Sequence, residues 1–115
     1  MSDAYEAFLH RKAITDPHTG LTDIPSLPES LFPFQKDITA WALRRGRAAL
    51  FAGTGLGKSF MELAWADAIH RETGRDVIHL APLAVSAQLV REAEKWGIAA
   101  HHVRDASDVR PGINI

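Results

Sequence analysis

One glycine-rich stretch near the middle of the chain has the residue types and spacing of a loop that binds polyphosphate. It reads Ala52-Gly53-Thr54-Gly55-Leu56-Gly57-Lys58-Ser59 and departs from the usual pattern only where Ala52 replaces the first glycine. Glycines let the backbone turn tightly, so that several N–H groups can point at one anion. A helix beginning at Lys58 would direct the positive end of its dipole toward the same anion. The stretch therefore predicts a site for the phosphates of a nucleotide.

Two side chains at the end of this stretch complete the predicted site. The flexible ammonium group of Lys58 would contact the β and γ phosphates. The hydroxyl of Ser59 would supply one oxygen ligand to Mg²⁺, which keeps most of its waters. The alternative is a glycine-rich turn followed by an exposed lysine. The other predicted phosphate contacts come from Gly53, Thr54, Gly55, Leu56 and Gly57.

Alternating strands and helices are predicted around the loop. Short apolar runs without a polar face are typical of strands that are buried on both sides. The expected strands are 48–52, 77–81, 99–103 and a last one starting at 113. The expected helices are 58–73, ended by Gly74, and a second one, ended by Gly97, whose inner face consists of Val85, Leu89, Ala93 and Trp96. This alternation predicts an α/β fold, a parallel sheet with helices on both faces.

The residues before the loop divide into three parts. We expect a short amphipathic helix over 4–13, capped by Asp3, and a proline-rich linker over 15–33. A further helix follows, with Gly46 at its end and an apolar face that consists of Phe34, Ile38, Trp41 and Ala42. We expect Trp41 and Trp96 to lie in the core. The domain boundaries that follow are 1–30 for the N-terminal helix and linker, and 31–115 for part of a nucleotide-binding domain.

Composition limits the classes of protein that remain. The 115 residues are 46% hydrophobic and 23% charged, with a net charge of −1, so no global basic field points to nucleic acid. The absence of cysteine excludes disulfides and thiolate metal sites. No apolar run is long enough to cross a membrane, and the N-terminus does not resemble a signal peptide. We expect a soluble cytoplasmic protein without a membrane partner.

Local charge and histidine patterns give weaker predictions. Residues 34–59 carry a net charge of +4, mostly from Arg44, Arg45 and Arg47. These arginines are expected to complement the dipole at a helix C-terminus, and a phosphate-contacting patch is the alternative. His101 and His102 are adjacent in a predicted strand and would face opposite ways, so we do not expect a zinc site.

Three segments, in this order, resemble motifs of the superfamily-two helicases, most closely the Swi/Snf-like DNA translocases. The first resembles the glutamine motif, the second the first helicase motif, and the third motif Ia with the helix after it. These segments are Leu31-Phe32-Pro33-Phe34-Gln35 with Trp41, then Gly55-Leu56-Gly57-Lys58-Ser59, and then Ala81-Pro82-Leu83-Ala84-Val85 with Gln88, Glu92 and Lys95-Trp96. The resemblance covers residues 31–96, a little over half of the chain.

The resemblance implies part of a RecA-like phosphate-loop NTPase domain that binds ATP and Mg²⁺, with Lys58 taking part in catalysis. It implies that Gln35 hydrogen-bonds the edge of adenine, with Phe34 near the base. An amide offers the donor and the acceptor that match adenine. The alternatives are a solvated Gln35 and a Phe34 that only staples its helix. Motif Ia implies that Pro82 and Ser86 contact the nucleic-acid backbone, and the alternative is that Ser86 is a helix N-cap.

The resemblance therefore predicts the ATP-binding part of an ATP-dependent DNA helicase or translocase. The family needs a strand ending in Asp-Glu and arginines from a second domain to hydrolyse ATP, and the 115 residues contain neither. We expect them downstream of Ile115, so the chain is expected to be a fragment that binds nucleotide without turnover. The alternatives are another phosphate-loop NTPase or small-molecule kinase, a non-catalytic nucleotide- or nucleic-acid-binding module, and a remnant that folds poorly.

Overall fold

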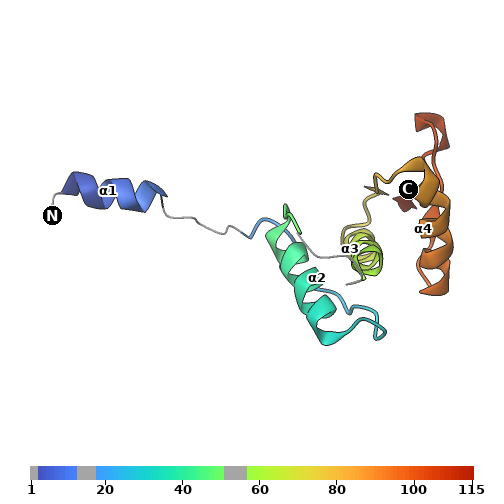
Figure 1. Ribbon diagram of the computed structural model, residues 1–115, viewed down its shortest axis with the longest axis horizontal. Coiled ribbons are helices and arrows are strands. Elements are labelled where there is room, and N and C mark those ends of the chain that lie inside the picture. The colour runs from blue at the N-terminus through green and yellow to red at the C-terminus, as the bar shows by residue number, and fades with distance from the viewer. Residues whose placement is uncertain (1–2, 13–17, 51–56) are drawn as a thin grey trace.

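A computed structural model describes residues 3–12, 18–50 and 57–115 of the chain. The fold is mixed α/β, with four α-helices, one 3₁₀ turn and three short strands in these ranges. Their order is α1 (Asp3–Lys12), α2 (Pro33–Arg45), α3 (Lys58–Thr73), β1 (Val77–Ile78), α4 (Leu83–Lys95), β2 (Ala100–His101), η1 (Ala106–Asp108) and β3 (Ile113–Asn114). Helix α1 confirms the predicted N-terminal helix and stands apart from the other elements (Figure 1). None of the described helices is long and apolar enough to cross a bilayer.

The three strands form a parallel sheet in the order β1-β3-β2. The predicted parallel pairing is confirmed, and so are strands within 99–103 and from 113 onward. The strand expected at 77–81 has only two residues, and Leu80 beyond it is 89% exposed. Residues 48–50 form no strand and are exposed, and the rest of that predicted strand, 51–52, lies outside the described residues. The apolar runs at 48–52 and 77–81 therefore led to a prediction of longer and more deeply buried strands than the structure shows in the described residues.

Both helices next to the sheet contribute to one core. Val77 of β1 and Ile113 of β3 are paired, so they point to the same face, where they pack with Leu63 of α3 and Leu89 of α4. Within the described residues, helices α3 and α4 thus cover one face of the sheet. The expectation of helices on both faces is not met there, because the side chains of Ile78 and its partners point the other way and Ile78 is mostly exposed.

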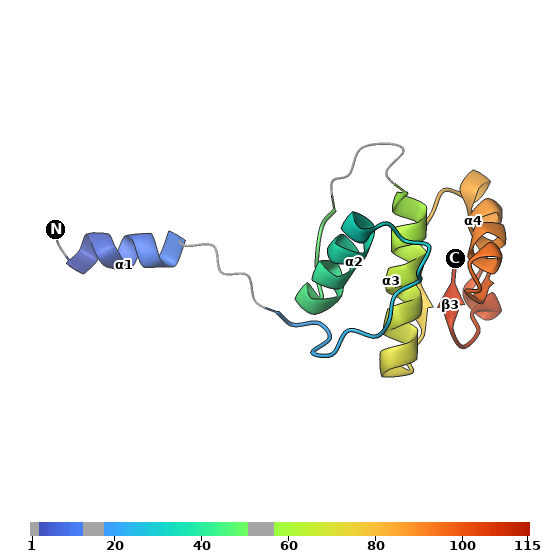
Figure 2. The same ribbon diagram turned by 90° about the horizontal axis from the view of Figure 1, so that it is seen from below.

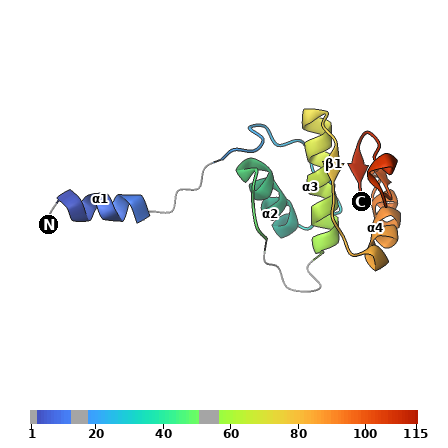
Figure 3. The same ribbon diagram turned by 90° about the horizontal axis from the view of Figure 1, so that it is seen from above.

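Helix α2 lies beside α3, as Figures 2 and 3 show from opposite sides. The end of α2 at Gly46, where φ is +86°, agrees with the prediction. Its buried face does not. Phe34 and Trp41 are exposed, whereas Gln35, Thr39 and Leu43 are buried. The face of α2 that contacts α3 is therefore displaced by about one residue from the most apolar face of the helix. The prediction of Trp41 as a core residue was wrong, because Trp41 is exposed. The Arg45 guanidinium lies 6.0 Å from the centre of the Trp41 ring.

A strap of three residues holds the C-terminal end of α2. The N–H groups of residues 19–21 donate to the carbonyl oxygens of Arg45, Arg44 and Leu43 at 3.2, 2.9 and 2.8 Å. These are carbonyls that the helix itself leaves unbonded. A side chain at Gly20 would collide with the Leu43 carbonyl oxygen, so only glycine fits in the strap. Part of the predicted linker therefore fixes the C-terminal end of α2.

Candidate nucleotide-binding site

The described part of the glycine-rich stretch is its end, Gly57-Lys58-Ser59. Its earlier residues, which include the predicted contacts Gly53, Thr54, Gly55 and Leu56, lie outside the described residues. Gly57 is the N-cap of α3 and has a φ of +73°, which favours glycine. Helix α3 begins at Lys58 and ends at Thr73 before Gly74, exactly the bounds predicted. The first backbone bond of the helix runs from the Met61 N–H to the Gly57 carbonyl, at 3.1 Å.

Two features at the start of α3 suit an anion. The N–H groups of its first turn have no acceptor within the helix, and the dipole places its positive end there. Lys58 is half-buried at this point, and its ammonium group has no carboxylate within 4.0 Å among the described residues. Ser59 follows, also half-buried. The first turn thus offers N–H donors, one positive charge and one hydroxyl.

Gln35 reaches this helix start from α2. Its side chain is only 5% exposed, and its Oε1 accepts a hydrogen bond of 2.8 Å from the Phe32 N–H, which caps the first turn of α2. Its Nε2 lies so close to Gly57 that a Cβ at that position would collide with it. The interpretation of Gln35 as a solvated first-turn residue is therefore wrong. The structure brings Gln35 and the end of the glycine-rich stretch together.

An open pocket of about 480 Å³ lies over this contact. Residues from all three motif segments line it, and they are Ser30, Phe32, Gln35, Gly57, Lys58, Ser59, Phe60, Glu92 and Trp96. Phe34 is not among them. Of the two phenylalanines in this motif, Phe32 lines the pocket, and its ring stacks on that of Phe34 with 6.2 Å between centroids. The sequence could have indicated Phe32, since it belongs to the same short motif two residues before Phe34.

Trp96 joins the third segment to this pocket. Its ring stacks on that of Phe60, one turn into α3, with 3.9 Å between the centroids and 16° between the planes. Trp96 is partly buried and packs against the core that contains Leu63 and against a second cluster of buried residues, which confirms its prediction as a core residue. Glu92 lies one turn earlier in α4 and accepts a hydrogen bond of 3.2 Å from Gln88. The end of α4 therefore forms one wall of the pocket.

The predicted nucleic-acid contacts lie elsewhere, at the other end of α4. Pro82 is the N-cap of α4, so the alternative interpretation of Ser86 as an N-cap is wrong. Ser86 is 4% exposed, and its hydroxyl contacts the Leu83 carbonyl at 3.0 Å and His102 Nε2 at 3.1 Å. Neither Pro82 nor Ser86 lines the pocket beside Gln35 and Gly57. The arginines Arg44 and Arg45 occupy the last turn of α2, where a helix dipole favours them.

The chemistry of the residues at the pocket fits the ligands that the sequence implies. A glycine with positive φ, free helix N–H groups and a lysine suit a triphosphate, and the Ser59 hydroxyl is an oxygen donor acceptable to Mg²⁺. The described residues contain no group of three His, Asp or Glu side chains that could hold a metal by themselves. Comparison with protein-family models, curated proteins and solved structures finds no match to this chain.

Proposed function

We propose that the chain is the ATP-binding part of an ATP-dependent DNA helicase or translocase, and that its sheet belongs to a RecA-like domain. The observation that carries the proposal is the packing of the buried Gln35 against Gly57 at the start of α3. Gln35 and Gly57 are 22 residues apart in the sequence, yet they meet at one pocket. This contact supports a site that binds a base and a phosphate chain together.

The division of roles follows from the residues that line the pocket. Lys58 and the first-turn N–H groups of α3 would hold the β and γ phosphates, and Ser59 would be the protein ligand of Mg²⁺. Bound Mg²⁺ neutralises phosphate charge. Phe32, with Phe34 stacked behind it, offers an aromatic surface for the base, while the Gln35 amide offers hydrogen bonds.

Nucleic acid would bind at the other end of α4. Strand β1 leads through Pro82 into α4, at the carboxyl edge of a parallel sheet, where ligands of such sheets bind. Because the Ser86 hydroxyl is buried and bonded, a backbone phosphate would be held by the first N–H groups of α4 rather than by that hydroxyl. We propose single-stranded or duplex DNA as the partner.

The test is a titration of the full chain with a non-hydrolysable ATP analogue and Mg²⁺, followed by NMR. We expect saturable shifts of the amides at 57–60 and of the Gln35 side chain. Lys58→Ala should weaken binding by about tenfold or more, since it removes a charge-assisted contact. Lys95→Ala is the matched control, because Lys95 is an exposed lysine outside the pocket. Equal affinity in Lys58→Ala and the unchanged chain would refute the proposal.

A further inference from the structure

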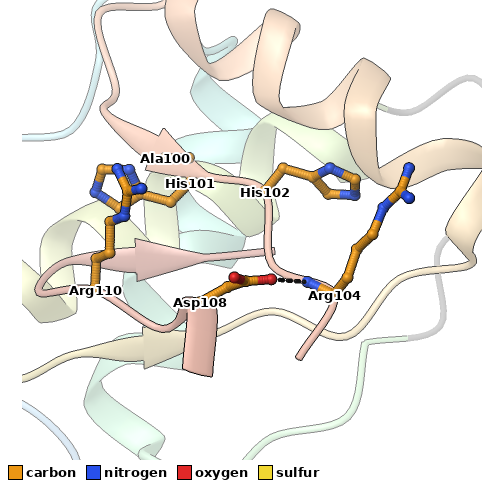
Figure 4. A pocket seen from close by; sticks show the side chains of 6 residues that line it. All are labelled: Ala100, His101, His102, Arg104, Asp108 and Arg110. Carbon is orange, nitrogen blue, oxygen red and sulfur yellow. Dashed lines mark hydrogen bonds between the residues drawn. The ribbon is translucent and has the colours of Figure 1, made fainter. Parts of the chain in front are cut away.

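A second pocket, of about 380 Å³, lies beside the edge strand β2 (Figure 4). Four of its six lining residues can carry positive charge or donate hydrogen bonds from nitrogen, and only one is acidic. The lining residues are Ala100, His101, His102, Arg104, Asp108 and Arg110. This pocket shares no lining residue with the nucleotide pocket. The two arginines extend toward opposite ends of it, with Asp108 between them (Figure 4).

Both guanidinium groups are free to meet an anion. Neither has a carboxylate oxygen within 4.0 Å in the part of the chain that the structure describes. Arg71 shows the contrast, since its guanidinium contacts Asp67 at 2.9 Å and the Ser26 carbonyl at 2.9 Å. The one carboxylate of the pocket, Asp108, faces the Arg104 main-chain N–H at 3.4 Å rather than either guanidinium. The pocket therefore has a surplus of positive charge.

Hydrogen bonds from two side chains, one buried and one exposed, hold the backbone on which these side chains stand. Asn114 is 1% exposed, and its amide exchanges two hydrogen bonds of 2.9 Å with the main chain of Arg110. The Asp76 carboxylate accepts the Gly112 N–H at 2.8 Å, which fixes the same loop to the start of β1. Burying the Asn114 amide is costly unless it is bonded, so its contacts define the loop conformation.

The His102 ring is held in the same way. Ser86 donates its single hydroxyl hydrogen to the Leu83 carbonyl, and its oxygen then accepts from His102 Nε2. The ring is thereby fixed to α4 from a buried position. The backbone and the His102 ring are thus preformed, whereas the exposed side chains of Arg104 and Arg110 would become ordered on a bound ligand.

We propose that this basic pocket is a binding site for phosphate groups. The planar guanidinium presents paired N–H donors that match phosphate oxygens, and His101 can add a ring N–H donor. Because the two guanidinium groups extend toward opposite ends of the pocket, a ligand that uses both carries more than one phosphate. That chemistry has two sources, a free oligophosphate and the backbone of a single-stranded nucleic acid. The proposal does not depend on ATP binding at the first pocket.

The experiment titrates the full chain carrying Lys58→Ala, so that binding at the nucleotide pocket is suppressed. The probes are inorganic pyrophosphate and a ten-nucleotide oligothymidylate, and the readout is the NMR shift of the amides at 101–110. We expect saturable shifts with at least one probe. Arg104→Gln and Arg110→Gln should each weaken that binding by about tenfold. Arg91→Gln is the matched control, because Arg91 is an exposed arginine of α4 outside the pocket.

Each outcome has a defined meaning. Saturation with pyrophosphate identifies a free oligophosphate as a sufficient ligand, whereas saturation with the oligonucleotide alone identifies the nucleic-acid backbone. A chain that saturates with neither probe overturns the proposal, and so does an equal loss of affinity in Arg91→Gln, Arg104→Gln and Arg110→Gln. Far-ultraviolet circular dichroism of each variant checks that the fold is retained. The double variant Arg104→Lys, Arg110→Lys keeps both positive charges and removes the paired N–H donors of the guanidinium groups. It should lower the affinity less than the glutamine variants do.

Discussion

Two buried side-chain amides, Gln35 and Asn114, lie beneath the two pockets, and they act differently. Gln35 caps its own helix through the Phe32 N–H and turns its Nε2 toward Gly57. Asn114 exchanges two bonds with Arg110 and donates to the carbonyls of Gly112 and Val77 at 3.3 and 3.4 Å. One amide packs against a glycine at the start of a helix, and the other joins a strand to a loop.

This difference indicates how each pocket keeps its shape. The nucleotide pocket depends on a close approach of α2 to the start of α3, so changes there should affect the ligand more than the fold. The basic pocket depends on hydrogen bonds inside the sheet, so changes beneath it should affect the fold first. The predictions below test that contrast.

The largest effect is expected for Asn114→Ala. The substitution removes the donors and acceptor that hold Arg110 and leaves a cavity beside the central strand. It should lower the free energy of unfolding by about 3 kcal/mol, because buried main-chain groups lose their partners. Urea denaturation followed by circular dichroism measures this. A loss below about 1 kcal/mol would show that the loop is held by something other than Asn114.

Asn114 also shows where sequence reasoning stops. An asparagine between two isoleucines near a turn does not by itself predict four hydrogen bonds, because its partners come from a loop and from a strand 37 residues away. The basic pocket was missed for the same reason. Its histidines and arginines have no recognised spacing, and only the loop conformation brings them to one place. The glycine-rich stretch was visible because all its residues are consecutive.

The helices were more predictable than the faces they bury. The bounds of α3 follow from Lys58 and Gly74, since a helix start and stop are encoded locally. The predicted buried face of α2 was wrong by about one residue. Phe34 and Trp41 favoured one face in the sequence, whereas the contact with α3 buries Gln35 instead. Burial of a polar glutamine is favourable only when its partners are in place. The Phe32 N–H is a local partner of Gln35, whereas the contact with Gly57 is tertiary.

A smaller effect is expected for Gly57→Ala, compared with Gly74→Ala at the other end of α3. Both glycines have positive φ, +73° and +70°, which costs alanine about 1 kcal/mol. At Gly74 an added Cβ meets nothing within 4 Å, whereas at Gly57 it displaces the buried Gln35 amide. We expect losses of about 2 kcal/mol at Gly57 and about 1 kcal/mol at Gly74, measured by urea denaturation. Equal losses would mean that Gln35 moves without cost.

Gln35 itself can separate stability from ligand binding. Gln35→Ala should cost about 1.5 kcal/mol, because it removes the bond to the Phe32 N–H and opens space beside Gly57. Gln35→Glu keeps the acceptor for that N–H, so it should retain more of the stability. A carboxylate there cannot donate a hydrogen bond and repels the triphosphate, so the affinity for the ATP analogue should still fall by about tenfold. Unchanged affinity in Gln35→Glu would place the base elsewhere.

The smallest effect compares two serines, one in each region. Ser86→Ala removes the contacts with Leu83 and His102 and should cost about 1 kcal/mol in stability. It should also weaken phosphate binding at the basic pocket by about threefold, because His102 loses its fixed orientation. Ser59 is half-buried, and its hydroxyl has no hydrogen-bond partner within the ranges that the structure describes. Ser59→Ala should therefore leave stability unchanged within about 0.5 kcal/mol.

The two serine variants then differ in what they do to ligands. Ser59→Ala should reduce the gain in affinity that Mg²⁺ gives the ATP analogue, measured by calorimetry with and without the ion, while binding without Mg²⁺ stays the same. Ser86→Ala should leave both of these affinities unchanged, since Ser86 does not line the nucleotide pocket. If Ser86→Ala weakened the ATP analogue as much as Ser59→Ala did, the two pockets would be coupled through α4, and their description as independent sites would be wrong.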